Sequence, residues 1–409
     1  MTSAELPPPP RLAALGRLVP DPSAFRAAPP DRPLLTRGAG PFTDLLDLAE
    51  IDDLLVERSL RRNDYRLVRD DAVLPDLDYV TSTLIHDQVP DGRKVATQLA
   101  AGATLILQGL NEYSKPLADF CRRLGHDLGR PVHANAYLTP PGAQGFAAHH
   151  DVRDAFIIQV SGRKHWTLRR PLLAEPVSAE TWDTVAGRAD PAEPPGEPWS
   201  EPTLEPGDCL WLPRGWIHSA RSAEEASLHL TLSLHSWTKH WALGQLLSTL
   251  GVQPGTRAAL DPDFLRDDEA ARAEAASWRA ALVGWLDRTD DAALAAAVRA
   301  AGLRTFAAPR RRPASAVLGG LDVAGAEFAV NAHAVHATSI AAGRLTLHLG
   351  DRALSMPQSL DTAVADLLAR DLVTVDGLDR PASRTARIEL LRTLYREGVI
   401  EPRDQSSLS

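Results

Sequence analysis

The sequence contains little cysteine and no long apolar run. Its 409 residues include 2 cysteines, Cys121 and Cys209, which is too few for a disulfide framework and is typical of a reducing compartment. No uninterrupted apolar stretch reaches the roughly 18 residues that span a bilayer, and residues 1–25 lack the continuous apolar region of a signal peptide. We therefore expect a cytoplasmic protein that does not bind membranes.

An excess of basic residues is also absent. With 44 lysines and arginines against 53 aspartates and glutamates, the chain has a formal net charge of -9. A general affinity for nucleic acids is therefore not expected, and a basic protein or peptide is the more natural partner. The 44% hydrophobic and 24% charged residues are typical of globular chains, and a length of 409 residues predicts two or three domains.

The first part of the chain is predicted to be an arm followed by helices. Residues 1–40 are rich in proline and arginine and show no sustained periodicity, so we expect an arm, with ordered structure beginning near Phe42. Apolar residues at helical spacing predict a helix over Thr43–Arg61. A second helix is predicted over Ser114–Leu124, with Gly125 at its end.

The middle of the chain has the alternating apolar pattern and the turn residues of short β-strands. The predicted strands are Ala134–Leu138, Phe146–Asp151, Ala155–Val160, Lys164–Leu168, Cys209–Leu212 and Ser227–Leu234. The turn at Ser161-Gly162 predicts a hairpin, and the proline-rich segment 190–206 predicts a loop. Short strands with turns between them fit a closed or sandwiched antiparallel barrel, in a domain over residues 41–245.

A predicted helical region follows the barrel. Residues 246–320 include an alanine-rich helix over Asp267–Ala301, which Gly302 is expected to end. An apolar stripe around Trp278 and Trp285 makes this helix a candidate dimer surface, and we expect a homodimer. Packing of the same stripe within one chain is the alternative.

Residues 321–409 combine short strands with two helices and resemble a winged helix, which makes the fold class mainly β with α-helices. The predicted elements are strands at Arg344–Leu349 and Leu372–Val375 and helices at Thr362–Arg370 and Ser383–Glu397. Acidic residues offset the arginines of this segment and leave no continuous basic face, so direct nucleic-acid binding is not expected.

Two histidines and one aspartate stand at a spacing that can hold a metal ion. His149-x-Asp151 is followed by the turn residues Pro213 and Gly215 and then by His218. Side chains of a strand alternate between its faces, so His149 and Asp151 are expected to point to the same side. Two imidazoles and one carboxylate form the ligand set of a mononuclear iron site and leave the opposite face open. We therefore expect His149, Asp151 and His218 to be catalytic metal ligands.

Other metals and other histidines fit this pattern less well. A structural zinc site closes its shell with four protein ligands, and no fourth candidate has suitable spacing. His150 is expected to point away from the site. His133, His165 and His229 are not needed as ligands. His229 shares the polar face of its strand with Thr231, which could bind a cosubstrate carboxylate or could simply be solvated.

Lys164 begins the strand after the Ser161-Gly162 turn. A lysine inside a barrel needs an anion, because an unpaired buried ammonium group is strongly disfavoured. Its charge could hold the distal carboxylate of a dicarboxylate cosubstrate whose other end chelates iron. A solvated lysine beside Arg163 is the alternative that composition alone favours.

Long stretches of the sequence resemble the JmjC-type ribosomal oxygenases, also called the cupin-4 family. The resemblance is carried by Asn135–Trp166, which includes the first histidine of the triad and its aspartate, and by Glu205–His218 and Leu228–Ser233. It is dense between Asn135 and Ser233, apart from the proline-rich stretch, and weaker elsewhere. The predicted order of a barrel, a helical region and a winged-helix-like domain also resembles that family.

The resemblance implies a double-stranded β-helix fold and an Fe(II)- and 2-oxoglutarate-dependent oxygenase that uses O2 to hydroxylate a protein side chain. It implies that the triad binds iron and that Lys164 binds the distal carboxylate of 2-oxoglutarate. Asn135 and Tyr137 match positions near the cosubstrate and the substrate, respectively, although Tyr137 could simply pack. Known members of the family act on arginine or histidine of ribosomal proteins, so a ribosomal substrate is implied without a choice between the two residues.

Two other functions fit the same residues. The iron site could hydroxylate a free amino acid or a peptide natural product. A metal-bound cupin or winged-helix interaction protein without catalytic activity is the alternative from another class. The intact triad and Lys164 speak against this last alternative.

Overall fold

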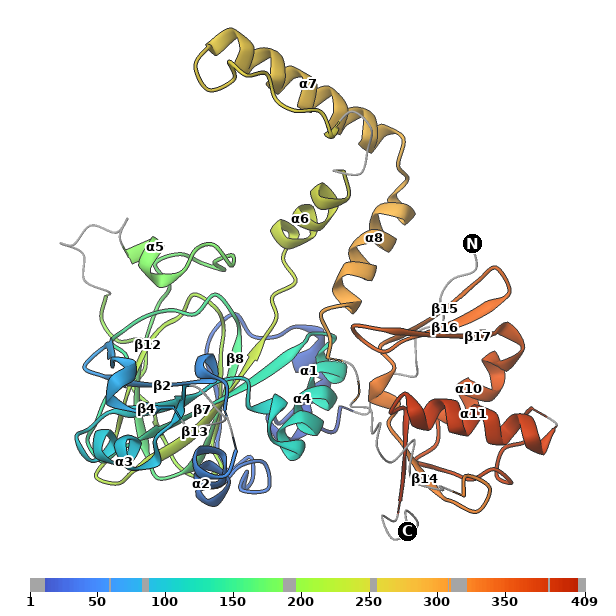
Figure 1. The fold of residues 1–409 in the computed structure, drawn as a ribbon. Coiled ribbons are helices and arrows are strands. Elements are labelled where there is room, and N and C mark those ends of the chain that lie inside the picture. Colours follow the sequence, from blue (N-terminus) through green and yellow to red (C-terminus); the bar gives the residue numbers. More distant parts are fainter. Residues whose placement is uncertain are drawn as a thin grey trace. The chain divides into compact units, whose positions relative to one another are not determined.

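A computed structural model describes residues 12–403, except 59, 83–87, 187–195, 251–255, 308, 310–321 and 382 (Figure 1). The chain divides into two compact units, and the division falls between Ser236 and Trp237. None of the described helices is long and apolar enough to cross a bilayer. The basic segment 310–313, whose composition predicts a linker, lies outside the described residues.

The N-terminal segment is part of the first unit. It forms helix α1 (Pro22–Ala27) and strand β1 (Leu34–Thr36), and β1 pairs with β11 (Cys209–Leu212). Phe25 of α1 is buried and packs edge-on against a tryptophan of β11. The expectation that ordered structure begins near Phe42 is wrong, because this proline-rich segment gains its order from tertiary contacts and not from helical or strand periodicity.

The helices of the first unit differ from prediction at their ends. Helix α2 covers only Leu48–Val56, because the side chain of Asp47 caps it by accepting a hydrogen bond from the amide of Glu50. Helix α4 covers Lys115–Leu128 and ends at a left-handed glycine, Gly129, instead of at Gly125. The remaining helices are α3 (Gly92–Ala100) and α5 (Trp182–Ala186), and 3-10 turns lie at Leu15–Arg17, Arg62–Asp64, Asp76–Asp78 and Leu110–Glu112.

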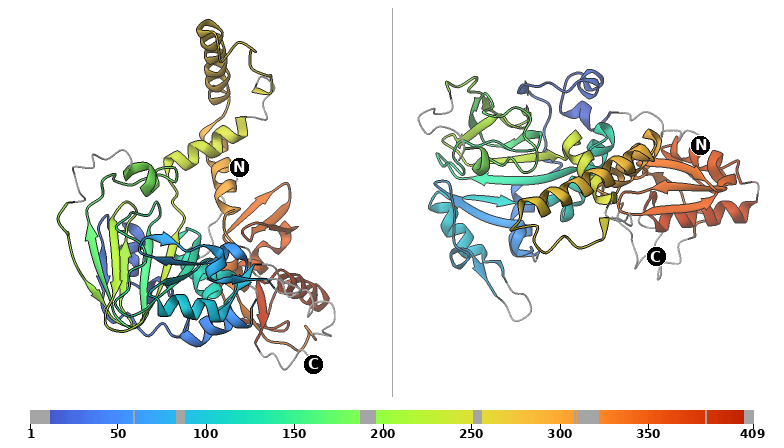
Figure 2. Two further views of the ribbon diagram at one scale, coloured as in Figure 1. Left: turned by 60° about the vertical axis from the view of Figure 1, so that its left-hand side comes forward. Right: turned by 90° about the horizontal axis from the view of Figure 1, so that it is seen from above.

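The first unit is built on two antiparallel sheets (Figure 2). The larger sheet has the strand order β1-β11-β8-β13-β7-β6-β2-β3, and the smaller has the order β10-β9-β12. The further strands of the larger sheet are β2 (Tyr65–Arg69), β3 (Ala72–Val73), β6 (Thr104–Leu107), β7 (Val132–Thr139), β8 (Ala155–Ser161) and β13 (Ser227–Leu234). The smaller sheet contains β9 (Lys164–Arg169), β10 (Thr203–Leu204) and β12 (Ile217–Ser222), and β4 (Val80–Thr81) pairs separately with β5 (Val89–Pro90).

Strand β13 explains how one sheet serves both a core and a cavity. Its leucines, such as Leu230 and Leu232, are fully buried in the main hydrophobic core. The residues between them, His229 and Thr231, line a cavity that is also lined by residues of the smaller sheet, such as Trp166. Alternation along the strand therefore places the core on one face and the cavity, between the two sheets, on the other.

The hairpin predicted at Ser161-Gly162 is wrong. Strand β8 belongs to the larger sheet and β9 to the smaller one, so the chain crosses between sheets at this turn. Gly162 has a φ of +63°, and a Cβ atom at this position would lie 1.9 Å from the carbonyl oxygen of Ala226. Only glycine fits such a close approach of two backbone segments. The turn thereby carries Lys164, the first residue of β9, to the opposite wall of the cavity.

The predicted loop over 190–206 is only partly described, since 187–195 lie outside the described residues. Within its second half, Thr203–Leu204 forms β10 and pairs with β9. Ser200 makes an isolated bridge with Leu168. This part of the segment is therefore an edge of the smaller sheet. An edge strand tolerates prolines, since some of its amides have no partner strand.

The second unit begins with three helices, α6 (Lys239–Leu250), α7 (Asp268–Asp287) and α8 (Asp291–Leu303). The continuous helix predicted over 267–301 is thus two helices, because the side chain of Asp290 caps a new helix by accepting a hydrogen bond from the amide of Ala293. Gly302 lies inside α8 and not after it. A Cβ atom there would be in ordinary van der Waals contact with the rings of Trp237 and Trp241.

Two small sheets and two helices complete the second unit. The sheets are β18-β14-β19 and β15-β16-β17, and their strands are β14 (Phe328–Val330), β15 (Ala337–Ala341), β16 (Arg344–His348), β17 (Ala353–Pro357), β18 (Leu372–Val373) and β19 (Ile400–Pro402). The helices are α10 (Asp361–Leu368) and α11 (Arg384–Arg396), with 3-10 turns at Ala332–Ala334 and Gln358–Leu360. Both helices and both sheets share one hydrophobic core, in which Phe328, Leu347, Leu367 and Leu391 are fully buried.

Candidate functional site

The segment that carries the first two candidate ligands is not the strand that was predicted over Phe146–Asp151. Its regular pairing is limited to one bridge, in which the amide of His149 donates to the carbonyl of His218 over 3.1 Å and the amide of His218 donates back over 2.8 Å. The carboxylate of Asp71 holds the segment from the other side by accepting a hydrogen bond from the amide of Ala147 at 2.8 Å. A side chain thus replaces the strand neighbour that a ladder would need.

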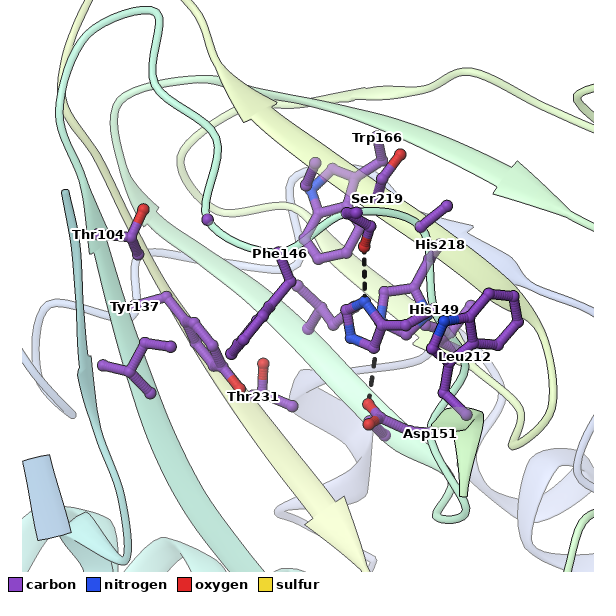
Figure 3. A pocket seen from close by; sticks show the side chains of 18 of the residues that line it. Thr104, Tyr137, Phe146, His149, Asp151, Trp166, Leu212, His218, Ser219 and Thr231 are labelled. Atoms are coloured by element: carbon purple, nitrogen blue, oxygen red, sulfur yellow. Dashed lines mark hydrogen bonds and ion pairs between the residues drawn. The ribbon is translucent and has the colours of Figure 1, made fainter. Parts of the chain in front are cut away.

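Three candidate ligands meet at this bridge (Figure 3). One nitrogen of each of His149 and His218 and one carboxylate oxygen of Asp151 all lie within 4.8 Å of one another. The Nε2 atom of His218 is 3.9 Å from Oδ2 of Asp151, and the two imidazole centroids are 4.5 Å apart. The bridge brings the three predicted ligands together, and their nitrogen and oxygen atoms converge on a volume that a single metal ion can fill.

Backbone carbonyls orient both imidazoles. The Nδ1 atom of His149 lies 2.8 Å from the carbonyl oxygen of Ala147, and Nδ1 of His218 lies 3.1 Å from that of Trp216. Each Nδ1–H donates to its carbonyl, which leaves the lone pair of Nε2 available to a metal. Burial, together with the nearby His149, lowers the pKa of His218 to about 4, so this imidazole is neutral at pH 7.

The other histidines lie outside this group. His150 is buried, its Nε2 atom lies 3.0 Å from the carbonyl oxygen of Glu180, and its ring meets Trp182 of α5 edge-on. It therefore faces away from the triad, as the alternation argument predicted. The imidazole of His165 is exposed and lies 2.7 Å from the hydroxyl of Thr203, outside the cavity.

A cavity of about 680 Å³ opens beside the triad. This volume lies within the roughly 300–1,000 Å³ that is usual for small-molecule sites. Lys164, Tyr137 and Thr231 line it, together with the triad. Asn135 is not among the lining residues; its Oδ1 atom accepts a hydrogen bond from the amide of Gly109 at 3.1 Å, and its side chain hydrogen-bonds Tyr137. A cosubstrate contact of Asn135 stays a prediction.

The amine of Lys164 is buried in the wall of this cavity. It donates to the hydroxyl of Thr139 over 2.9 Å and lies 3.4 Å from Nδ1 of His229. No carboxylate of the described residues forms an ion pair with it, and burial lowers the pKa of Lys164 to about 7. A bound anion would restore the charged form, so the cavity is chemically prepared for a carboxylate at this end.

Aromatic side chains complete the cavity, including Phe146 and Trp166, which the sequence analysis did not single out. The ring of Tyr137 stacks on His229, with centroids 4.7 Å apart and planes 3° from parallel. Burial raises the pKa of Tyr137 to about 12, with a further contribution from Asp151. Phe146 meets His149 edge-on, and Trp166 lies across from His229. Their positions on alternating strand faces were the available signal, but the same pattern is typical of an ordinary core.

The model of the JmjC domain family matches residues 112–241, which include the triad and Lys164. Ribosomal oxygenase 1 of Homo sapiens is 40% identical over 172 residues, covering 40% of this chain and 26% of that protein. The bifunctional lysine-specific demethylase and histidyl-hydroxylase NO66 of Drosophila persimilis is 32% identical over 230 residues, covering 55% of this chain and 31% of that protein. The chain thus spans less than a third of the length of these curated relatives.

Solved structures resemble the chain over nearly its whole length. The structure of ycfD from Escherichia coli has a TM-score of 0.55 at 16% identity and covers 94% of this chain and 99% of its own. A second structure is that of YcfD, a ribosomal oxygenase from Escherichia coli, in complex with cobalt and 2-oxoglutarate. It has a TM-score of 0.54 at 16% identity, and the match covers 95% of this chain and 99% of that chain. This likeness concerns the fold and confirms a mixed α and β fold with a cupin-like JmjC domain. The family match shows a JmjC domain over residues 112–241, and the chain is similar to a curated ribosomal oxygenase and, in fold, to YcfD.

Proposed function

We propose that the protein is an Fe(II)- and 2-oxoglutarate-dependent oxygenase that hydroxylates a side chain of a protein, with ribosomal proteins as the substrate class. The observation that carries the proposal is that His149, Asp151 and His218 share one cavity with Lys164, a buried amine that has no carboxylate partner among the described residues. The names of the curated relatives, a ribosomal oxygenase and a histidyl-hydroxylase, support the same class of reaction.

The residues present fit this cofactor set. Two imidazoles and one carboxylate suit Fe(II), and His149, Asp151 and His218 would hold it. When bound, iron supplies the activation of O2, coupled to the oxidative decarboxylation of 2-oxoglutarate. The overall reaction balances, since one oxygen atom enters the substrate as a hydroxyl group and the other enters succinate, while CO2 leaves.

The protein side chains have separate tasks in this reaction. The ammonium group of Lys164 binds the distal carboxylate of 2-oxoglutarate, and the buried hydroxyl of Thr139 holds that amine in place. Thr231 offers a hydroxyl on the same wall. Tyr137 and Phe146 present apolar faces that exclude water and position a substrate side chain beside the triad.

Finer features of the fold and assembly are part of the proposal. The two facing sheets form a double-stranded β-helix barrel, and the strands and helices after residue 321 form a winged-helix-like module. A homodimer forms through α7, whose 20 residues include none that is buried and whose Trp278 is 44% exposed. An apolar helical stripe with this exposure is typical of an interface.

The test is succinate formation from 2-oxoglutarate with Fe(II) and O2. We expect the wild-type protein to form succinate and the His149→Ala and His218→Ala variants to lose at least about 100-fold, since each lacks a metal ligand. His165→Ala is the matched control, because it removes an exposed imidazole from outside the cavity. Equal succinate formation by all four proteins, or none by the wild type, contradicts an oxygenase.

A further inference from the structure

Arg66 lies in register with residues of neighbouring strands of the larger sheet that line the cavity. Strand register pairs Arg66 with Ile106, Ile106 with Tyr137, and Tyr137 with His229. Paired residues of neighbouring strands project to the same face of a sheet. All four side chains line the cavity, so Arg66 belongs to its wall, at the end of this row of paired residues farthest from His229.

The guanidinium of Arg66 is close to the candidate metal ligands. Its Cζ atom lies 5.4 Å from the centroid of the Phe146 ring, and that ring in turn lies 5.6 Å from the ring of His149. One aromatic ring therefore separates the guanidinium from a ligand. A side chain that packs on Phe146 beside the triad would lie within reach of Arg66.

The positive charge of Arg66 has no ion-pair partner among the described residues. Its buried Nε atom has no hydrogen-bond acceptor in the part of the chain that the structure describes. Asp71 and Asp183 also line the cavity, but both are exposed. Arg66 is half-buried, so water screens its charge less than it screens these exposed carboxylates.

We infer that Arg66 is a specificity-determining residue, which excludes a cationic side chain from the pocket and favours a planar, neutral side chain with a hydrogen-bond acceptor, such as the imidazole of histidine. A guanidinium group has five donors, no acceptor and a permanent positive charge, so an arginine side chain offers Arg66 only repulsion. A neutral imidazole has one acceptor nitrogen for the guanidinium and a flat ring for the aromatic walls.

This inference deepens the proposed function, on which it rests, by choosing between its two candidate target residues. It also gives the negative and the positive side chains of the cavity different roles. The exposed carboxylates at Asp71 and Asp183 can attract a basic polypeptide, while Arg66 rejects a basic side chain at the reaction position. Such rejection of the wrong ligand is a common source of specificity.

The experiment uses a pool of synthetic peptides with lysine and glycine flanks and a central histidine, arginine or asparagine. Wild type, Arg66→Gln, Arg66→Lys and Arg66→Glu are incubated with the pool, Fe(II), 2-oxoglutarate and O2, and peptides that gain one oxygen atom are identified by mass. We expect the wild type to prefer histidine over arginine peptides at least about tenfold. Arg66→Gln should lose most of this preference, Arg66→Glu should reverse it and Arg66→Lys should keep it.

Arg69→Gln is the matched control, since it removes an arginine of the same strand that hydrogen-bonds Gln98 instead of lining the cavity. Arg69→Gln should keep the wild-type preference. A wild-type preference for arginine peptides, or a preference that Arg66→Gln and Arg66→Glu leave unchanged, overturns the inference. Failure to form succinate from 2-oxoglutarate without any peptide concerns the proposed function instead.

A second measurement decides the case in which no peptide is oxidised. The metal-free protein, prepared with a chelator, is titrated with 4-methylimidazole and with methylguanidinium, and the shift in unfolding temperature is recorded. We expect 4-methylimidazole to stabilise the wild type more than methylguanidinium, and Arg66→Glu to reverse this order. If 4-methylimidazole stabilises both proteins more than methylguanidinium, the inference is overturned. The unfolding transition without ligand also reveals any variant that fails to fold.

Discussion

His149 and His218 exchange two backbone hydrogen bonds, of 3.1 and 2.8 Å, in an isolated bridge that does not continue as a ladder. This bridge and the hydrogen bonds from each Nδ1 to a backbone carbonyl hold the two imidazoles at a centroid separation of 4.5 Å. Preorganised ligands of this kind lose little conformational freedom when a metal binds. The geometry of the site therefore depends on the turn that delivers His218 to the bridge.

Gly215→Ala is expected to disturb that turn. Gly215 has a φ of +86°, its amide donates to the carbonyl of Asp151 over 2.9 Å, and a Cβ atom would lie 2.8 Å from the carbonyl oxygen of Leu173. We expect a loss of about 1–3 kcal/mol in the free energy of unfolding and weaker binding of Co(II), measured by titration. Gly142→Ala is the control, since it also has a positive φ but no atom within 4 Å. Equal Co(II) affinity in the two variants would contradict a role for the turn.

The affinity for a dicarboxylate is expected to depend on pH through Lys164. Burial lowers its pKa to about 7, so without an anion the amine is charged below pH 7 and neutral above it. The carboxylate binds the charged form, and its affinity should therefore fall above pH 7, by up to about tenfold per pH unit. Succinate binding to the Co(II)-loaded protein between pH 6 and 8.5 measures this. Lys164→Arg should bind with little pH dependence, and a flat profile for the wild type would argue against the assignment.

Lys164→Met is expected to stabilise the protein without ligand while abolishing 2-oxoglutarate binding. The pKa of a lysine is ordinarily 10.5, as in the unfolded chain, and burial lowers it to about 7 in the folded protein, so between these pH values the unfolded state binds more protons. The cost of the buried amine to stability is therefore full below pH 7 and falls as the pH rises from 7 to 10.5. At pH 7, Lys164→Met should gain at least about 1 kcal/mol in urea denaturation, and a loss of stability would mean that the amine has an anionic partner.

The proposed dimer makes a prediction about α7. Trp278 contacts Phe264 and is otherwise half exposed, and Leu286 on the same helix is 42% exposed. Trp278→Ser should shift the protein toward the monomer, as measured by sedimentation, because it removes a large apolar surface from the interface. Ala276→Ser, on the same helix, should leave the mass unchanged. A monomeric wild type rules out the dimer.

The predictions from sequence were accurate where the pattern is local. The strands around β7, β9 and β13 and the helix α11 all lie within a few residues of their predicted ends. Helix ends were less accurate, because a capping side chain such as Asp47 or Asp290 decides them. The hairpin at Ser161-Gly162 failed for a different reason, since a turn signal does not say in which sheet the next strand will pair.

The sequence by itself determined which chemical groups this protein can bring to a site, namely two histidines, an aspartate and a lysine at spacings that a β-rich fold can bring together. It also determined the alternating faces on which they project, because that period follows from backbone geometry. Only the tertiary structure decided that Lys164 is buried without a carboxylate, that Thr139 is its partner and that Arg66 faces the same cavity. Burial and unpaired charge arise between segments that are distant in the chain, and no local pattern encodes them.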